Sequence, residues 1–148
     1  MKKHKFLYFS IILLLVSTLS TSFYSNAATI DTPQPCASAY LSSYGGYVYL
    51  PGDGEVRVYF NVSGTGYMDE LGALRIELYE STNGTNWDLV KTFNHDTTAG
   101  MLSYIDDYHS GYVSYDGVAG RYYQAYVGIW GGKGGQGDAR WFWTIAKH

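Results

Sequence analysis

The sequence predicts an all-β protein: an antiparallel β-sandwich of about seven to eight strands, with a small β-barrel as the alternative. Three observations lead to this fold class. Tyr, Val and Thr are abundant while strong helix formers are few, which favours strands. Apolar residues recur at every second position in several short segments, as they do in half-buried strands. Glycine-rich turn signals separate these segments, and no segment shows the pattern of a long helix.

The N-terminus carries the pattern of a secretory signal peptide over residues 1–27. A basic start precedes the uncharged apolar run Phe6–Val16, and small residues at Ser25 and Ala27 suit cleavage near Ala27-Ala28. An uncleaved membrane anchor is the alternative, but the apolar run is short for a span of about 20 residues. We therefore expect a secreted, extracellular protein with no stable membrane insertion after cleavage.

The rest of the chain divides into an extended N-terminal arm (28–38) and a single domain (39–148). Cleavage would remove Lys2, Lys3 and Lys5, which leaves seven basic residues against thirteen acidic ones. This acidic balance argues against nucleic acid and anionic lipid as partners.

The first strands of the domain are predicted on either side of a tight turn. Residues 39–50 form one edge strand, which Gly45-Gly46 would interrupt as a bulge or strand switch. The turn follows at residues 50–55, where Pro51 and two glycines supply the dihedral angles. A half-buried strand then places four residues on one face: Val56, Val58, Phe60 and Val62.

The middle of the chain is predicted to hold a short turn and a hairpin. "GYMDELGA" suits one short helical turn around residues 69–71, with Asp69 as its cap, Glu70 exposed and Leu71 closing the core. The next strand (74–81) turns Leu74, Ile76 and Leu78 inward. Asn83-Gly84 is a strong hairpin signal because both residues tolerate positive φ, and residues 87–93 form the return strand.

The C-terminal half is predicted to contain the longest strand. Residues 94–111 are irregular, with a possible short strand at 101–105, and a further strand and turn follow over 111–120. The longest strand covers 121–130 and buries Tyr123, Ala125, Val127 and Ile129. A last strand over 140–146 closes the chain.

The glycine-rich segment 131–137 is predicted to be the tip of the hairpin between the last two strands. A phosphate-binding loop needs a following helix, and here a strand follows; no Ser or Thr comes after Lys133 either. Glycine allows a tight return at this point.

The aromatic residues of the last strands support two interpretations. Trp141 and Trp143 share one face of their strand, and Arg140 and Phe142 share the other. The tryptophans either pack in the core or form an exposed platform on which sugar rings stack. The candidate ligand-binding residues are Trp130, Trp141, Trp143, Tyr112 and Tyr126.

The motif "MDELG" (Met68–Gly72) and three further segments carry a resemblance to a known family. The further segments are "ESTNG…W" (80–87), a Gly-x-x-Tyr-x-Ala strand (120–125) and the glycine-rich loop. Together they resemble a family of small secreted proteins of unknown function from Gram-positive, clostridia- or bacilli-like bacteria, with an immunoglobulin-like or fibronectin type III-like pattern. The resemblance covers residues 40–144, and it implies a sandwich but no activity.

In immunoglobulin-like modules a tyrosine at the start of the penultimate strand bonds back to a turn, and the resemblance gives this place to Tyr123. With it, the residues predicted to have structural roles are Tyr123, Asp69, Leu71, Gly72, Asn83 and Gly84.

The sequence offers weak grounds for metal or catalytic chemistry. His95-Asp96, Asp106-Asp107 and His109 lie close together but match no calcium or zinc ligand spacing. Ser103 with Asp107 and His109 lacks an oxyanion motif, and the adjacent Asp69-Glu70 would point apart in an extended chain. We therefore expect no metal, no cofactor and no catalytic residues.

The function predicted by elimination is a secreted, non-catalytic binding or interaction module, with cell-wall or environmental polysaccharide, or another extracellular protein, as the partner. A structural or self-assembling surface protein is the alternative. Its edge strands could pair between copies, and the lone Cys36 could link a dimer through a disulfide. A small secreted hydrolase is the second alternative.

Overall fold

The protein is an antiparallel all-β domain, as predicted. The computed structural model describes residues 34–35 and 38–148, and no helix occurs within them. The predicted signal peptide, most of the arm and Cys36 lie outside the described residues. The strands are β1 (Gln34–Pro35), β2 (Leu41–Gly52), β3 (Glu55–Ser81), β4 (Asp88–Asn94), β5 (Leu102–Asp116), β6 (Tyr122–Lys133) and β7 (Gln136–Trp143). Because the described part lacks helices, it contains no helix that could cross a membrane.

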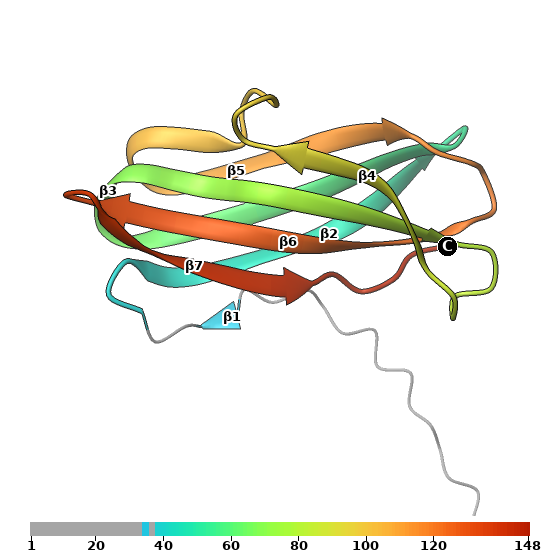
Figure 1. Cartoon of the computed structure of the whole chain (residues 1–148), viewed down its shortest axis with the longest axis horizontal. Coiled ribbons are helices and arrows are strands. Elements are labelled where there is room, and N and C mark those ends of the chain that lie inside the picture. Colours follow the sequence, from blue (N-terminus) through green and yellow to red (C-terminus); the bar gives the residue numbers. More distant parts are fainter. Residues whose placement is uncertain (1–33, 36–37) are drawn as a thin grey trace, which may run out of the picture.

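One strand, β3, organises the whole sheet. Its first half, residues 55–63, pairs with β2 on one edge and with β5 on the other. Its second half, residues 70–81, pairs with β6, and β4 pairs along its other edge. Figure 1 shows the result: β4, the second half of β3, β6 and β7 lie in front, and β2, the first half of β3 and β5 lie behind. The strands thus belong to one hydrogen-bonded sheet that curls around its own buried face.

The core lies inside this curl and follows the predicted alternation, except at Leu74. Leu74 was predicted to face inward but is only partly buried, because the pairing of β3 with β6 shifts register between Ala73 and Arg75, and Ala73 is buried in its place. The first half of β3 buries Val56, Val58, Phe60 and Val62, and the second half buries Ile76 and Leu78. Strand β6 adds its four predicted residues, each almost fully buried: Tyr123, Ala125, Val127 and Ile129. Since side chains of a strand alternate between faces, the residues between these point to the outer surface.

The predicted helical turn around residues 69–71 is wrong, because β3 stays extended through this segment. The chain bends instead, between Ser63 and Met68, where the pairing with β5 shifts register. Leu71 is fully buried, as expected, and Asp69 accepts a hydrogen bond from the amide of Gly134 in place of capping a turn (2.7 Å). At Gly72 a Cβ would lie 2.1 Å from the Met101 carbonyl oxygen, so only glycine allows this close approach.

The predicted interruption at Gly45-Gly46 is also wrong. Both glycines pair in regular register with Asn61 and Phe60, and β2 continues through them. Gly46 serves close packing: a Cβ there would lie 2.5 Å from the Tyr59 carbonyl oxygen and 3.2 Å from the Phe142 ring. Because Gly46 has no side chain, Phe142 of β7 can pack closely against β2.

Residues 94–111 are more regular than predicted. Strand β5 runs continuously from Leu102 to Asp116 because both halves of β3 offer it a pairing edge. The backbone of β5 departs from strand geometry at Ile105, where φ is 55°, a value that is unusual for a β-branched residue. The longest strand is accordingly β3 with 27 residues, and not β6 with 12.

Two predicted turns form, with one difference in mechanism. The glycine-rich loop is the tip of the β6–β7 hairpin, where Gly134 and Gly135 have φ of 62° and 76°. The hairpin after β3 also forms, but Gly84 alone takes positive φ there. Asn83 acts through its side chain, whose Oδ1 accepts hydrogen bonds from the amides of Thr85 and Asn86 (2.9 Å each).

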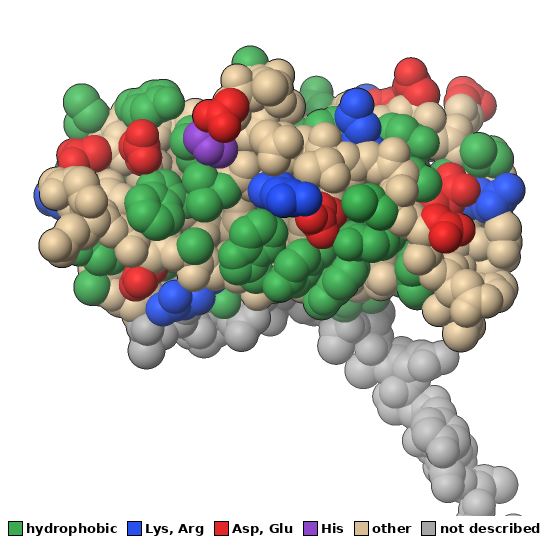
Figure 2. Space-filling model, in the orientation of Figure 1, with side chains coloured by type: hydrophobic (Ala, Val, Ile, Leu, Met, Phe, Trp, Pro, Cys, Tyr) green, Lys and Arg blue, Asp and Glu red, His purple; other side chains and the backbone are tan. Residues whose placement is uncertain are grey.

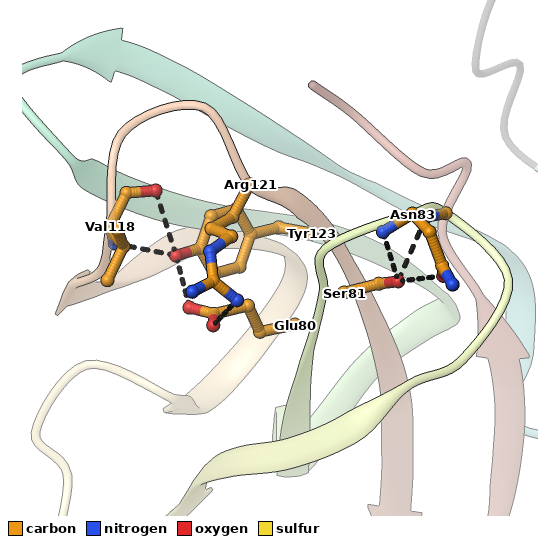
Figure 3. A network of polar contacts seen from close by, with 7 residues as sticks. Glu80, Ser81, Asn83, Val118, Arg121 and Tyr123 are labelled. Atoms are coloured by element: carbon orange, nitrogen blue, oxygen red, sulfur yellow. Dashed lines mark hydrogen bonds and ion pairs between the residues drawn. The ribbon is translucent and has the colours of Figure 1, made fainter.

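Tyr123 ties the start of β6 to the preceding turn. Its buried hydroxyl accepts a hydrogen bond from the Val118 amide (2.7 Å) and donates one to Glu80 (2.6 Å), as Figure 3 shows. Arg121 lies 3.3 Å from the same carboxylate. Burial and the bond to Glu80 raise the pKa of Tyr123 to about 12.

Candidate functional site

The five predicted ligand-binding residues lie in three places. Trp141, Trp143 and Tyr126 form one group on the outer face of β6 and β7. Trp130 lies further along the same face of β6, beside the hairpin tip. Tyr112 lies on β5, among side chains of the other outer face.

The first group is an exposed cluster of stacked rings. Tyr126 stacks against Trp141 (centroids 5.1 Å apart, planes at 28°) and against Trp143 (4.8 Å, 29°). Tyr79 on β3 extends the group, with its ring 5.1 Å from Trp143. We call Tyr79, Tyr126, Trp141 and Trp143 the aromatic cluster. Trp141 is 42% exposed and Trp143 51%, so these tryptophans do not pack in the core.

Strand register and one glycine hold the cluster together. Tyr126 pairs directly with Trp143, and Gly128 pairs with Trp141. A Cβ at Gly128 would come within 2.5–2.7 Å of the Trp141 indole. The indole therefore lies over the bare backbone of β6, in the space that any other residue would fill. This position brings its ring alongside Tyr126.

Polar groups border the aromatic cluster on β3. Arg75 and Glu77 form an ion pair (2.6 Å), and the Tyr79 hydroxyl donates a hydrogen bond to Glu77 (3.0 Å). This bond, the largest cause, raises the pKa of Tyr79. Figure 2 shows hydrophobic side chains gathered over β6 and β7 beside a basic and an acidic group. The face thus combines ring surfaces for stacking with donors and acceptors at its border.

Tyr112 belongs to a second aromatic surface. Tyr47, Tyr59 and Tyr112 lie at one level of β2, β3 and β5, because Tyr59 pairs with both of the others. The Tyr47 and Tyr59 rings are stacked at 4.9 Å, and Tyr59 and Tyr112 lie 5.1 Å apart. We call these three residues the tyrosine row. It lies on the outer face of the first half of the sheet, away from the aromatic cluster.

Trp130 borders a surface hollow of about 440 Å³ beside the tip of the β6–β7 hairpin. Its indole lies over Gly132 and Gly137, where added Cβ atoms would come within 2.5–2.9 Å of the ring. Its Nε1 donates a hydrogen bond to Glu70 (3.3 Å). Asp69, Tyr104 and Lys133 also line the hollow.

The residues weighed for catalysis do not assemble. Ser103 donates its hydroxyl to Asp106 (2.8 Å), which lowers the pKa of Asp106, while His109 Nε2 bonds to the Gly100 carbonyl (2.9 Å). No hydrogen bond is found between Ser103 and His109. Within residues 34–35 and 38–148, no group of three His, Cys, Asp or Glu residues comes together in a way that could hold a metal ion.

The sequence alone missed one of the four residues of the aromatic cluster and two of the three residues of the tyrosine row. The predicted alternation that turns Ile76 and Leu78 inward leaves Tyr79 facing outward. Nothing near Tyr79 in the sequence connects it to Trp143, which lies beside it only because β3 pairs with β6 and β6 with β7. Tyr47 and Tyr59 reach Tyr112 in the same way across three strands. Alternation along one strand can show that a tyrosine faces outward, but it does not show which residues of other strands lie beside that tyrosine.

No protein-family model matches this chain, and no curated protein matches it. The resemblance that Met68–Gly72 carries therefore stays a prediction.

Proposed function

We propose that this protein is a secreted, non-catalytic binding module that holds a polysaccharide against its aromatic cluster. We further propose that the curled sheet is a β-sandwich of the immunoglobulin-like or fibronectin type III-like kind. Its open outer faces would then be the surfaces available to partners.

The main support for this proposal is that two exposed tryptophans, Trp141 and Trp143, stack against Tyr126. Trp141 and Trp143 are spaced two residues apart on one strand face, which corresponds to roughly 7 Å. Such neighbouring ring faces can stack on successive sugar rings of a linear chain. Exposed aromatic patches of this kind are typical of interaction sites.

The polar groups of β3 that border the aromatic cluster also support a sugar-binding site. Sugars present hydroxyl groups around an apolar ring face, so a sugar site needs stacking surfaces with hydrogen-bonding groups at the side. Arg75, Glu77 and the Tyr79 hydroxyl supply these groups next to the rings. Their mutual bonds hold them in place before a ligand arrives.

The test is binding of the secreted chain to insoluble cellulose, chitin and peptidoglycan, followed by co-pelleting and by tryptophan emission. Trp143→Ala should weaken binding at least tenfold, because losing roughly 100 Å² of contact removes about 2.5 kcal/mol. Tyr112→Ala is the matched control: Tyr112 is exposed to a similar degree (53%) but belongs to the tyrosine row. Its binding should equal that of the wild type.

Two results would overturn the proposal. Equal losses in both variants would show that the aromatic cluster is not the site. No saturable binding to any of the three polymers, together with mass that grows with concentration, would favour the self-assembling surface protein.

A further inference from the structure

The hollow beside Trp130 carries an inference that deepens the proposed function and rests on it. Three of its lining residues are paired across neighbouring strands: Tyr104 on β5, Glu70 on β3 and Gly132 on β6. The hollow lies between Tyr104 and Glu70 on one side and the hairpin tip on the other. The Trp130 indole fills the space above Gly132 and forms part of the wall. Its volume of about 440 Å³ falls within the range of small-ligand sites.

Adjacent residues of a regular strand point apart, but the alternation of β3 is broken here: Met68 and Leu71 are buried, while Asp69 and Glu70 between them are both exposed. Both carboxylates therefore line the hollow, and each uses one oxygen within the protein. Asp69 Oδ2 accepts the Gly134 amide (2.7 Å), which fixes the hairpin tip, and Glu70 Oε2 accepts the Trp130 indole N–H (3.3 Å). These contacts engage neither Asp69 Oδ1 nor Glu70 Oε1. Lys133 is the one basic residue in the lining, so the hollow carries a net negative charge.

Aromatic rings accompany these carboxylates. Trp130 lies beside Glu70, and Tyr104, which is 66% exposed, stands on the strand next to it. Aromatic faces attract cations, and a carboxylate forms its strongest hydrogen bonds with a charged donor. The combination is complementary to an ammonium group carried on a compact, ring-sized body.

The hollow also lies on the same face as the aromatic cluster. Trp130 and Tyr126 both point outward from β6, four residues apart, which corresponds to roughly 14 Å. A linear chain that lies along β6 and stacks on the cluster would place a later residue in the hollow.

We propose that this hollow binds a protonated primary amine, and that its ligand is a 2-amino sugar residue of the polysaccharide held by the aromatic cluster. The ammonium group lies between the two carboxylates, and the sugar ring stacks beside Trp130. An acetylated amine has no charge, so it gains nothing from Asp69 and Glu70.

The test compares a glucosamine oligomer with an N-acetylglucosamine oligomer of the same length, at a pH where the free amines are protonated. Titration calorimetry on the secreted chain should show roughly tenfold tighter binding of the amine oligomer. The double variant Asp69→Asn, Glu70→Gln should lose this preference, because it keeps the acceptors for Gly134 and Trp130 but removes both charges. Lys133→Gln should strengthen it, because the competing cation is gone.

The possible results separate this inference from the proposed function. In one outcome, the wild type binds both oligomers equally well, and Trp143→Ala no longer binds the acetylated oligomer. This outcome overturns the inference and leaves the proposed function standing. A preference that survives in the double variant, or in Glu70→Gln alone if the double variant does not fold, also overturns the inference. So does the failure of both oligomers to bind. A lysine-rich peptide serves as a competing ligand. If it binds the wild type more tightly than the amine oligomer does, and if the double variant no longer binds it, the ligand is not an amino sugar.

Discussion

At the scale of single residues, Tyr123 links stability to pH. Its hydroxyl is buried and bonds to Val118 and Glu80, and its pKa is raised from 10.0 to about 12. The folded state therefore keeps the phenol proton over a range in which the unfolded chain loses it. The stabilisation is fully present below pH 10 and is lost as the pH rises to 12.

Tyr123→Phe should lower the free energy of unfolding at neutral pH by about 2 kcal/mol, because it leaves the Val118 amide without its buried partner. Between pH 10 and pH 12 the wild type should lose about 2.5 kcal/mol of its free energy of unfolding because Tyr123 titrates, and the variant should not show this loss. Urea unfolding from pH 7 to pH 12 checks both effects. Wild type and variant should converge at high pH, and a constant difference would show that Tyr123 does not titrate as described.

At the scale of elements, the aromatic cluster depends on how β6 and β7 pair. The Trp141 indole occupies the space above Gly128, and its place beside Tyr126 follows from this contact. Gly128→Ala adds a methyl group where ring atoms lie 2.5–2.7 Å away, so the indole must move off the strand.

We expect Gly128→Ala to reduce polysaccharide binding and to destabilise the fold by about 1–2 kcal/mol. Thermal unfolding and co-pelleting measure the two effects. Gly135→Ala is the control for adding a methyl group to a glycine of the same hairpin, since nothing lies within 4 Å of its Cβ position, although its φ of 76° brings strain. Unchanged binding in Gly128→Ala would mean that the ring contact with Tyr126 is not needed.

The sequence predicts individual strands better than their connections. Alternation located the buried face of β3 and β6, because each strand packs one face against the core. It failed for β5, where Asp106, Asp107 and His109 break the apolar pattern and both halves of β3 supply the pairing instead. It also read Gly45-Gly46 as a break, although Gly46 provides room for Phe142.

The candidate site could be predicted only in part for the same physical reason. Trp141 and Trp143 follow from alternation within β7, and Tyr126 from alternation within β6. Their partnership with Tyr79 depends on register between strands that are far apart in sequence. The hollow at Trp130 depends further on the bend of β3, which carries Asp69 and Glu70 to the hairpin tip.

At the scale of the whole molecule, the curled sheet closes by side chains where β7 meets the start of β2. Phe142 packs on Tyr44 with centroids 5.4 Å apart, and Ser38 donates a hydrogen bond to Asp138. No strand pairing joins β2 to β7 among the described residues. The seam therefore relies on packing, with Phe142 facing inward from β7 and its neighbours Trp141 and Trp143 facing outward.

Phe142→Ala should destabilise the protein by about 3 kcal/mol, because it opens a cavity against Tyr44 and Gly46 at this seam. Trp143→Ala, one residue away on the outer face, should cost less than about 1 kcal/mol. Chemical denaturation of the two variants side by side measures the contrast. Similar losses in both would contradict the assignment of inner and outer faces to β7.

The indole N–H signals of the four tryptophans report whether the outer face of β6 and β7 binds a polysaccharide. These signals can be assigned by single Trp→Phe variants and followed by nitrogen–proton NMR while a soluble oligosaccharide is added. Trp141 and Trp143 should shift together and saturably, and Trp87, in the loop between β3 and β4, should stay unchanged. Shifts at Trp87 with none at Trp141 and Trp143 would show that the outer face of β6 and β7 is not the binding surface.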